Sequence, residues 1–254
     1  MAAPPKKLYD ENSVAKLTCY VSIDLGSQAQ ASPTTGIFIP DGYNAGDEVD
    51  MILWLMGHHD NSAYPPSLSI DDYWFKYTHF RFREFVNSGQ KNVILAAPSL
   101  GPGSQSGSLI NRGGLAAYID QVLAALQAYG PFTSLPTLGQ LVIACHSGGG
   151  APMREIATTT QQYSPNLREL WGFDCLYGGS DDSVWTNWAK GNAYKRLRVR
   201  YGSGGTANMS LSLKRMASKL ANVNVDGSTG TEHNKVPVTY WYEFMRKATF
   251  FLDK

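Results

Sequence analysis

The feature that most constrains this chain is an apolar, strand-like run that ends in a serine set among small residues. Residues 141–145 are continuously apolar, as in a strand covered on both faces of a sheet. His146 and Ser147 follow, residues 148–150 are glycine, and an amphipathic helical pattern runs over 149–162. Such a short turn places the Ser147 hydroxyl at the edge of a sheet and beside a helix N-terminus, where backbone N–H groups favour negative charge.

Apolar runs of strand length alternate with amphipathic stretches through the rest of the chain. We expect strands over 17–25, 35–39, 49–56, 92–97, 140–145, 169–176 and 197–201, and helices over 72–87, 115–127, 149–162, 184–189, 211–220 and 238–252. Two opening strands followed by strand–helix alternation predict an α/β fold, a three-layer sandwich with a mostly parallel, twisted sheet flanked by helices. Ligand sites in such folds lie at the carboxyl ends of the strands.

The chain length sets the domain organisation. The 254 residues suffice for one core, so we predict a single domain over 1–254. Residues 1–12 are polar, and we expect them to form a flexible N-terminal segment. Only a short segment separates Tyr177 from Trp185, which leaves little room for a cap over the carboxyl ends of the strands, so we expect no large cap domain.

Composition limits the partners and the compartment. Charged residues make up 17% of the chain and the formal net charge is +1, which argues against a nucleic-acid-binding surface. The arginines at 196, 198 and 200 alternate along one strand, and we interpret them as a solvated or salt-bridged edge. No apolar run is long enough for a membrane span. The three cysteines, Cys19, Cys145 and Cys175, lie in apolar runs, so we expect buried free thiols. Free thiols favour a cytoplasmic protein, and a secreted protein that has lost its leader is the alternative.

The segment around Ser147 resembles the nucleophile elbow of the α/β-hydrolase superfamily, a serine between small residues on a strand-to-helix turn. Gly149 is the small residue on the far side, whereas Cys145 stands where the family usually has glycine. The succession of His-Ser-Gly-Gly, an apolar strand with Asp-x-x-Tyr-Gly and a late histidine is similar to the superfamily over most of residues 17–252. The resemblance implies a serine hydrolase with Ser147 as nucleophile and the N–H of Gly148 as an oxyanion donor.

A nucleophilic serine needs a base, which is normally a histidine. The chain has five histidines. His146 adjoins Ser147, and its side chain should point away from the nucleophile. His233 lies in a polar loop before the last helical pattern, where the superfamily carries its base, so we predict that His233 is the catalytic histidine.

The acid that orients this histidine is predicted from the cost of burial. Asp174 lies inside the apolar run 169–176, and a carboxylate in such a place is costly unless it is paired. We therefore expect Asp174 to accept the second imidazole N–H of the base. Asp181 and Asp182 remain alternatives, although a solvated loop and a helix N-cap would also account for them.

The run 49–56 is followed by Gly57, His58 and His59, which resembles the His-Gly loop of the superfamily, although a methionine precedes the glycine. The resemblance implies that the N–H of His58 is the second oxyanion donor, provided that Gly57 lets the loop approach Gly148. A metal site of His58, His59 and Asp60 is the less favoured interpretation, because adjacent residues rarely point at one ion. We expect no metal and no cofactor.

Aromatic residues offer candidate walls for a substrate pocket, namely Tyr64, Trp185 and Trp188. The predicted function is hydrolysis of a carboxylic ester, short-chain or aryl, through an acyl-enzyme on Ser147, so the expected partner is a small-molecule ester or amide. A peptidase or amidase with the same triad is one alternative. A non-catalytic ligand-binding protein is the other, and it would be favoured if Ser147 and His233 lay far apart.

Overall fold

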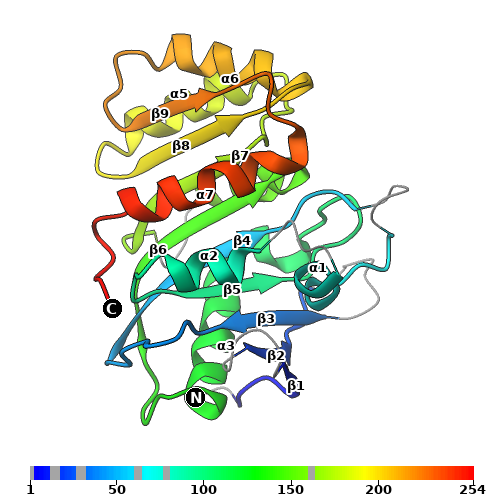
Figure 1. Cartoon of the computed structure of the whole chain (residues 1–254), viewed down its shortest axis with the longest axis vertical. Coiled ribbons are helices and arrows are strands. Elements are labelled where there is room, and N and C mark those ends of the chain that lie inside the picture. Colours follow the sequence, from blue (N-terminus) through cyan, green and yellow to red (C-terminus); the bar gives the residue numbers. More distant parts are fainter. Residues whose placement is uncertain (1–2, 12–17, 27–32, 60–64, 77–80, 160–163) are drawn as a thin grey trace.

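We describe a computed structural model of the chain, which covers residues 3–11, 18–26, 33–59, 65–76, 81–159 and 164–254 (Figure 1). Within these residues the strands form one sheet in the order β1-β2-β3-β5-β4-β6-β7-β8-β9. Pairing is parallel from β5 through β4 to β9 and antiparallel among β1, β2, β3 and β5. The predicted α/β sandwich with a mostly parallel sheet is confirmed.

The strands are β1 (Lys7–Glu11), β2 (Thr18–Ser22), β3 (Thr34–Phe38), β4 (Glu48–Leu55), β5 (Ile94–Pro98), β6 (Thr137–His146), β7 (Leu167–Phe173), β8 (Arg196–Tyr201) and β9 (Val223–Gly227). The helices are α1 (Ile70–Lys76), α2 (Phe82–Ser88), α3 (Gly114–Tyr129), α4 (Gly150–Thr158), α5 (Asp181–Gly191), α6 (Gly205–Met216) and α7 (Val236–Lys247). The 3-10 turns are η1 (Gly107–Ile110), η2 (Ser147–Gly149) and η3 (His233–Lys235).

Both edge strands of the sheet differ from the prediction. Lys7–Glu11 forms β1 where a flexible segment was expected, and β9 was not predicted at all. Edge strands face solvent, so they lack the apolar runs that mark central strands. In β1 only Glu11 is buried, and its carboxylate accepts hydrogen bonds from Tyr20 and Arg83. The single helix expected over 72–87 is also corrected, since α1 and α2 are separate helices.

The central strands carry the core and fix the site at their carboxyl ends. Residues 51–55 of β4 and 141–145 of β6 are fully buried, and these strands pair directly. The helices α2 and α7 pack together on one face of the sheet, while α4, α5 and α6 follow one another on the opposite face (Figure 1). Trp241 of α7 stacks on Phe173 of β7 and lies against Trp54 of β4, with ring centroids 5.8 and 5.5 Å apart. This aromatic packing fixes α7, and therefore the loop that precedes it, against the sheet.

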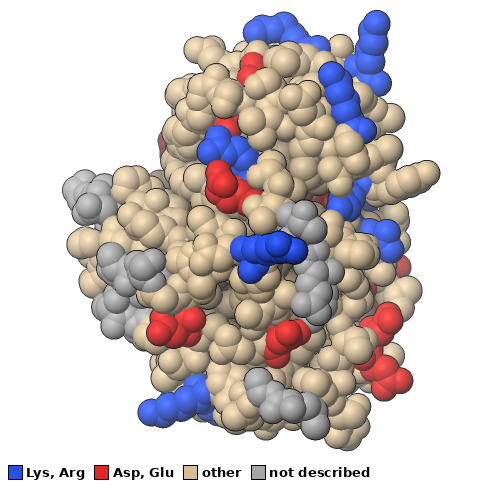
Figure 2. Space-filling model, turned by 180° about the vertical axis from the view of Figure 1, so that it is seen from behind, with Lys and Arg blue, Asp and Glu red and all other residues tan. Residues whose placement is uncertain are grey.

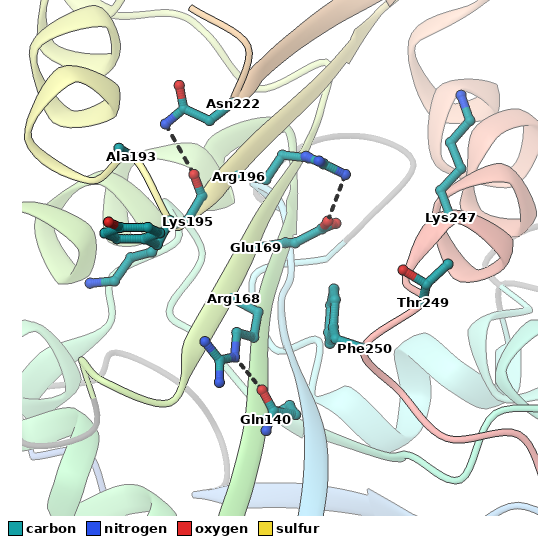
Figure 3. Close-up of a pocket in the computed structure, with 11 residues that line it drawn as sticks. Gln140, Arg168, Glu169, Ala193, Lys195, Arg196, Asn222, Lys247, Thr249 and Phe250 are labelled. Atoms are coloured by element: carbon teal, nitrogen blue, oxygen red, sulfur yellow. Dashed lines mark hydrogen bonds and ion pairs between the residues drawn. The ribbon is translucent and has the colours of Figure 1, made fainter.

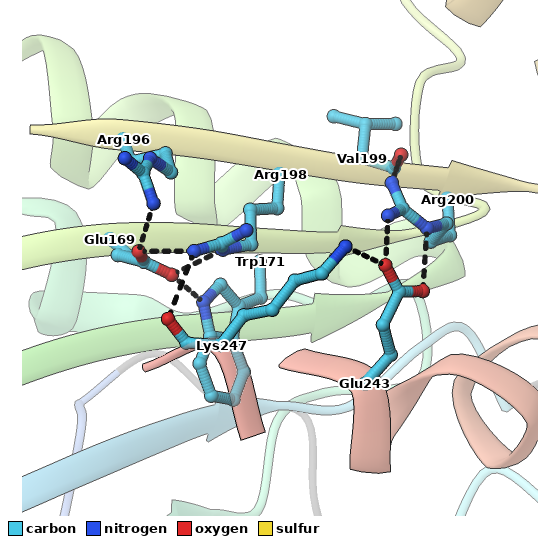
Figure 4. Close-up of polar contacts among 8 residues, drawn as sticks. All are labelled: Glu169, Trp171, Arg196, Arg198, Val199, Arg200, Glu243 and Lys247. Atoms are coloured by element: carbon cyan, nitrogen blue, oxygen red, sulfur yellow. Dashed lines mark hydrogen bonds and ion pairs between the residues drawn. The ribbon is translucent and has the colours of Figure 1, made fainter. Parts of the chain in front are cut away.

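The arginines of β8 are salt-bridged as expected, but β8 lies between β7 and β9 and is no edge. Arg198 donates to both oxygens of Glu169 at 2.6 and 2.8 Å, and Arg200 donates to both oxygens of Glu243 on α7 (Figure 4). Strand alternation turns both guanidinium groups to the face that α7 covers. Both guanidinium groups are buried, and each is paired with a carboxylate.

None of the helices in the described ranges has the length and apolar character needed to cross a membrane.

The ion pair of Glu243 predicts a specific acid dependence of stability. Burial acts to raise the pKa of Glu243, but hydrogen bonds and charge from Arg200 and Lys247 outweigh it and lower the pKa from 4.5 to about 2. A carboxyl group with a lowered folded-state pKa stabilises the fold above its unfolded pKa and loses that contribution as the pH falls through the folded value. The loss should therefore occur between pH 4.5 and about 2.

We expect Glu243→Gln to lower the free energy of unfolding at pH 7 by about 1–3 kcal/mol, because Arg200 stays buried without a carboxylate. Below pH 4.5 the difference from the wild type should shrink, which urea unfolding at several pH values measures. Glu232→Gln is the control, since the Glu232–Lys235 pair is exposed and should be worth less than about 1 kcal/mol. Equal effects of the two substitutions at pH 7 would contradict this interpretation.

Candidate active site

Ser147 sits at the junction of β6 and α4 with a left-handed backbone, φ 53°. A positive φ is uncommon for residues other than glycine and stores strain that the surroundings must hold in place. The neighbouring glycines make the turn possible. A Cβ on Gly149 would lie 2.5 Å from the carbonyl oxygen of Leu55, and one on Gly150 would lie 2.2 Å from that of Cys175. Backbone segments from three strand ends therefore touch one another at this point.

The loop after β4 closes over the same turn. A Cβ on Gly57 would lie 2.8 Å from the Cβ of Ser147, so only glycine permits this approach. The backbone nitrogen of His58 lies 3.2 Å from the position that a Cβ on Gly148 would take. The structure thus brings the backbone of His58 beside Gly148, as the sequence predicted.

His59, the next described residue of this loop, is held by a contact of its own. His59 is buried, and its backbone N–H donates to the carbonyl of Pro102 at 2.9 Å. Asp60 lies outside the described residues, and so does Tyr64, one of the predicted pocket walls.

His233 and Asp174 are in direct contact, with 2.6 Å between Nδ1 and Oδ2. Asp174 is fully buried, and its other oxygen accepts from the backbone N–H of Gly202 at 2.9 Å and from the hydroxyl of Thr206. Like Ser147, Asp174 has a positive φ, 48°. The carboxylate is held by segments that follow β7 and β8, and it fixes the orientation of the imidazole.

The two alternative acids are engaged elsewhere. Asp181 pairs with Arg154 at 2.7 Å and accepts from the N–H of Gly178. Asp182 accepts from the hydroxyl of Ser212 at 2.6 Å. Of the three carboxylates considered, Asp174 is the one that contacts His233.

The pKa of Asp174 follows from these partners. Burial alone would raise it, but the hydrogen bonds from His233, Gly202 and Thr206 outweigh burial, and the pKa lies below its usual value of 3.8. The carboxylate is therefore ionised at neutral pH although no part of it is exposed.

Sequence reasoning missed Tyr177, whose hydroxyl lies between the serine and the histidine. It is 3.5 Å from Oγ of Ser147 and 3.4 Å from Nε2 of His233. In the described part of the chain these two groups are linked through Tyr177 and not by a direct hydrogen bond. Burial raises the pKa of Tyr177, so its hydroxyl is protonated at neutral pH. The available signal was its position, three residues after Asp174 and just before two glycines.

His146 has a structural role that the sequence did not indicate. It is buried, its Nε2 lies 3.2 Å from the carbonyl oxygen of His233, and the two rings are 4.5 Å apart and tilted by 33°. His146 therefore supports the loop that carries His233.

A cavity of about 390 Å³ opens beside Ser147. His58, Gly148 and Tyr177 line it near the serine, and the Arg154–Asp181 pair lines it farther away. The cavity lies at the carboxyl ends of β4, β6 and β7, as expected for this type of sheet.

Trp185 and Trp188 are not among the residues that line this cavity, which corrects their predicted role. They are 1% and 7% exposed, and their rings pack edge-to-face with centroids 5.8 Å apart. Positions three apart share one face of a helix, and in α5 that face is turned to the core.

Comparisons with known proteins identify the fold. A ferulic acid esterase superposes with a TM-score of 0.60 at 12% identity, over 92% of this chain and 97% of the other. The thermophilic esterase Est2 of Thermogutta terrifontis gives 0.54 at 12% identity, over 88% and 90%. The fluorophosphonate-binding serine hydrolase FphF of Staphylococcus aureus gives 0.51 at 11% identity, over 97% of each chain. No family model and no curated protein matches the sequence.

These structural neighbours are esterases and serine hydrolases, and at such low identity the likeness concerns the fold. The chain has the α/β-hydrolase fold, as its resemblance to that superfamily implied.

The contact between His233 and Asp174 can be tested by proton NMR. A proton held between an imidazole Nδ1 and an ionised carboxylate should resonate far downfield, because this charge-assisted hydrogen bond is short. We expect one such resonance in the wild type and its loss in Asp174→Asn. Asp181→Asn is the control and should retain it, since Asp181 contacts Arg154 instead. A downfield resonance that survives Asp174→Asn would contradict the assignment.

Proposed function

We propose that this protein is a serine hydrolase that cleaves carboxylic esters, short-chain or aryl, through an acyl-enzyme on Ser147. The observation that supports the proposal most strongly is the 2.6 Å contact between Asp174 and His233. The same histidine is separated from Ser147 by a single group, the hydroxyl of Tyr177. A strained serine, a histidine and a buried ionised carboxylate form the set of groups that acyl transfer requires.

In the first step His233 accepts the proton of Ser147 at Nε2 while Oγ attacks the carbonyl carbon of the ester. Asp174 stays ionised, keeps Nδ1 protonated and stabilises the imidazolium that forms. The lowered pKa of Asp174 supports this role, because the carboxylate does not take the proton itself. The imidazolium then protonates the leaving oxygen, and the alcohol or phenol departs.

The negative charge on the carbonyl oxygen needs preorganised donors. The N–H groups of Gly148 and His58 are proposed for this part, since the two residues adjoin at the cavity wall. Each such donor typically contributes a factor of about 10²–10³ to the rate constant. Water then attacks the acyl-enzyme, with His233 as its base, and the acid is released.

An ester of modest size suits the cavity. Its volume of about 390 Å³ is at the small end of ligand sites, and the structural neighbours include a ferulic acid esterase and a thermophilic esterase. Tyr177 is half exposed and places an aromatic ring at the cavity, where it can contact an aryl group.

An activated serine should react with a fluorophosphonate probe. We expect stoichiometric labelling of Ser147, with the Oγ–phosphorus bond formed as fluoride leaves, located by mass spectrometry of the digested protein. Ser147→Ala and His233→Ala should abolish the label, and Asp174→Asn should lower kcat/KM for an aryl acetate by about 10²–10⁴-fold.

The matched control is Ser104→Ala. Ser104 is a buried serine with a positive φ of 60° that lies close to Gly148, and among the described residues its hydroxyl has no hydrogen-bond partner, so this variant should keep the label. Labelling that persists in Ser147→Ala, or wild-type protein that is folded and stays unlabelled, would overturn the proposal.

The hydroxyl of Tyr177 occupies the region in which a leaving oxygen has to receive its proton from His233. A substrate must therefore displace it, at the cost of two long hydrogen bonds. We expect Tyr177→Phe to raise kcat/KM for a small ester by up to about tenfold, because a hydrogen bond of this kind is worth about 0.5–1.5 kcal/mol. Steady-state kinetics on an alkyl and an aryl acetate measures the change.

Tyr242→Phe is the control for that substitution, since Tyr242 lies exposed on α7 and should be neutral. A tenfold or larger loss of kcat/KM in Tyr177→Phe would show instead that the hydroxyl assists the reaction.

A further inference from the structure

A second cavity lies at the amino ends of the parallel strands, at the opposite edge of the sheet from Ser147 (Figure 3). Its volume is about 480 Å³. The walls come from the first residues of β6, β7 and β8, from the turn before β9 and from the segment after α7. The proposed ester hydrolysis uses none of these residues.

Positive charge dominates this cavity. Arg168, Lys195, Arg196 and Lys247 line it, against the single carboxylate of Glu169. The whole chain has a net charge of only +1, so the excess is local. In Figure 2, Lys and Arg side chains likewise gather in the upper part of the molecule, the half that β8, β9, α5 and α6 build in Figure 1.

The lining carboxylate is already engaged. Glu169 accepts two hydrogen bonds from buried Arg198 and one from the indole N–H of Trp171 (Figure 4). Arg196 reaches it only at 3.6 Å, with a half-exposed side chain. Lys247 shares Glu243 with Arg200. Each of these carboxylates therefore serves two or more cations, and the cavity keeps a positive surplus.

Two cations of the cavity have neutral hydrogen-bond partners. Lys195 donates to the hydroxyl of Ser164 at 2.8 Å, and burial lowers the pKa of its ammonium group. Arg168 donates to the side-chain amide of Gln140, and Asp50 is near enough to interact with it electrostatically. An anion in the cavity would offer both side chains a charged partner.

Aromatic rings accompany these charges. Tyr194, the residue before Lys195, is 98% exposed and lines the cavity. Phe250 lies across the cavity from Lys195 (Figure 3). The turn that carries Tyr194 is fixed, since the side-chain amide of Asn222 donates to the carbonyl oxygens of Ala189, Asn192 and Lys195 at 3.0–3.1 Å. This part of the cavity wall is therefore held in place by the protein itself, which lowers the cost of ordering it on binding.

We propose that this cavity binds a small phosphate monoester that carries a flat ring. A phosphate group matches the guanidinium and ammonium donors that three segments contribute to the cavity lining, and an exposed tyrosine offers a stacking surface for the ring. The site lies across the sheet from Ser147 and binds its ligand independently of ester hydrolysis.

The test is a titration with adenosine monophosphate as the probe, followed by calorimetry and by amide chemical shifts of the wild-type protein. We expect submillimolar binding that weakens with salt, with shift changes around Arg168 and Lys195. Arg168→Gln and Lys195→Gln should each raise Kd about tenfold or more, and Tyr194→Ala about fivefold. Lys214→Gln, which removes an exposed cation on α6, should leave Kd unchanged.

Three results would overturn the proposal. The first is no binding of adenosine monophosphate, and the second is equal binding by inorganic phosphate, which would mean an adventitious anion contact only. The third is shift changes around Ser147 instead of Lys195. Protein whose Ser147 has been blocked with the fluorophosphonate should bind the probe as well as free protein does, which separates this site from the proposed active site.

Discussion

Direct contact between backbone segments at the carboxyl ends of β4, β6 and β7 is the constraint on which this site depends. Where Gly57, Gly149 and Gly150 stand, any Cβ would come within 3 Å of an atom of a neighbouring segment. Only chains without side chains at these positions can approach so closely. The approach holds Ser147 in a left-handed conformation and brings the His58 loop beside it. The strain of the turn is sustained by the fully buried strands β4 and β6 that lead into it.

A second requirement is a buried carboxylate that stays charged. Asp174 has no exposed surface, and its ionised form is stabilised by hydrogen bonds from three segments: the His233 loop, the end of β8 and the start of α6. His233 is positioned in turn by His146, whose ring contacts its backbone carbonyl, and by α7, which aromatic packing fixes to the sheet. The geometry at His233 therefore depends on elements across half of the sheet. This explains how a half-exposed loop can hold one imidazole in one orientation.

The amino and carboxyl ends of the parallel strands differ in how their charged residues are paired. At the carboxyl ends of the strands the carboxylates have partners within the protein, Asp174 the imidazole of His233 and Asp181 the guanidinium of Arg154. At the amino ends of the strands the lining cations outnumber the lining carboxylates, and Lys195 donates to the hydroxyl of Ser164. The excess of cations at the amino ends follows from the alternation of side chains along β8. Arg198 and Arg200 lie beneath α7, where they form ion pairs with Glu169 and Glu243. Arg196 and Lys247 are left with shared partners at the rim.

Local patterns of apolar period and small residues were enough to predict the central strands, the strand–turn–helix at Ser147 and the late loop of His233. Sequence reasoning missed β1 and β9, since edge strands need no apolar run, and it placed Trp185 and Trp188 at a pocket when helical spacing buries both. The choice of Asp174 over Asp181 and Asp182 needed the folded chain, which brings Asp174 to His233 across 59 positions. So did the place of the Tyr177 hydroxyl between serine and histidine. The same holds for the basic cavity, whose walls come from five separate segments. Contacts of this kind depend on where distant strands end in space, which no local pattern of residues encodes.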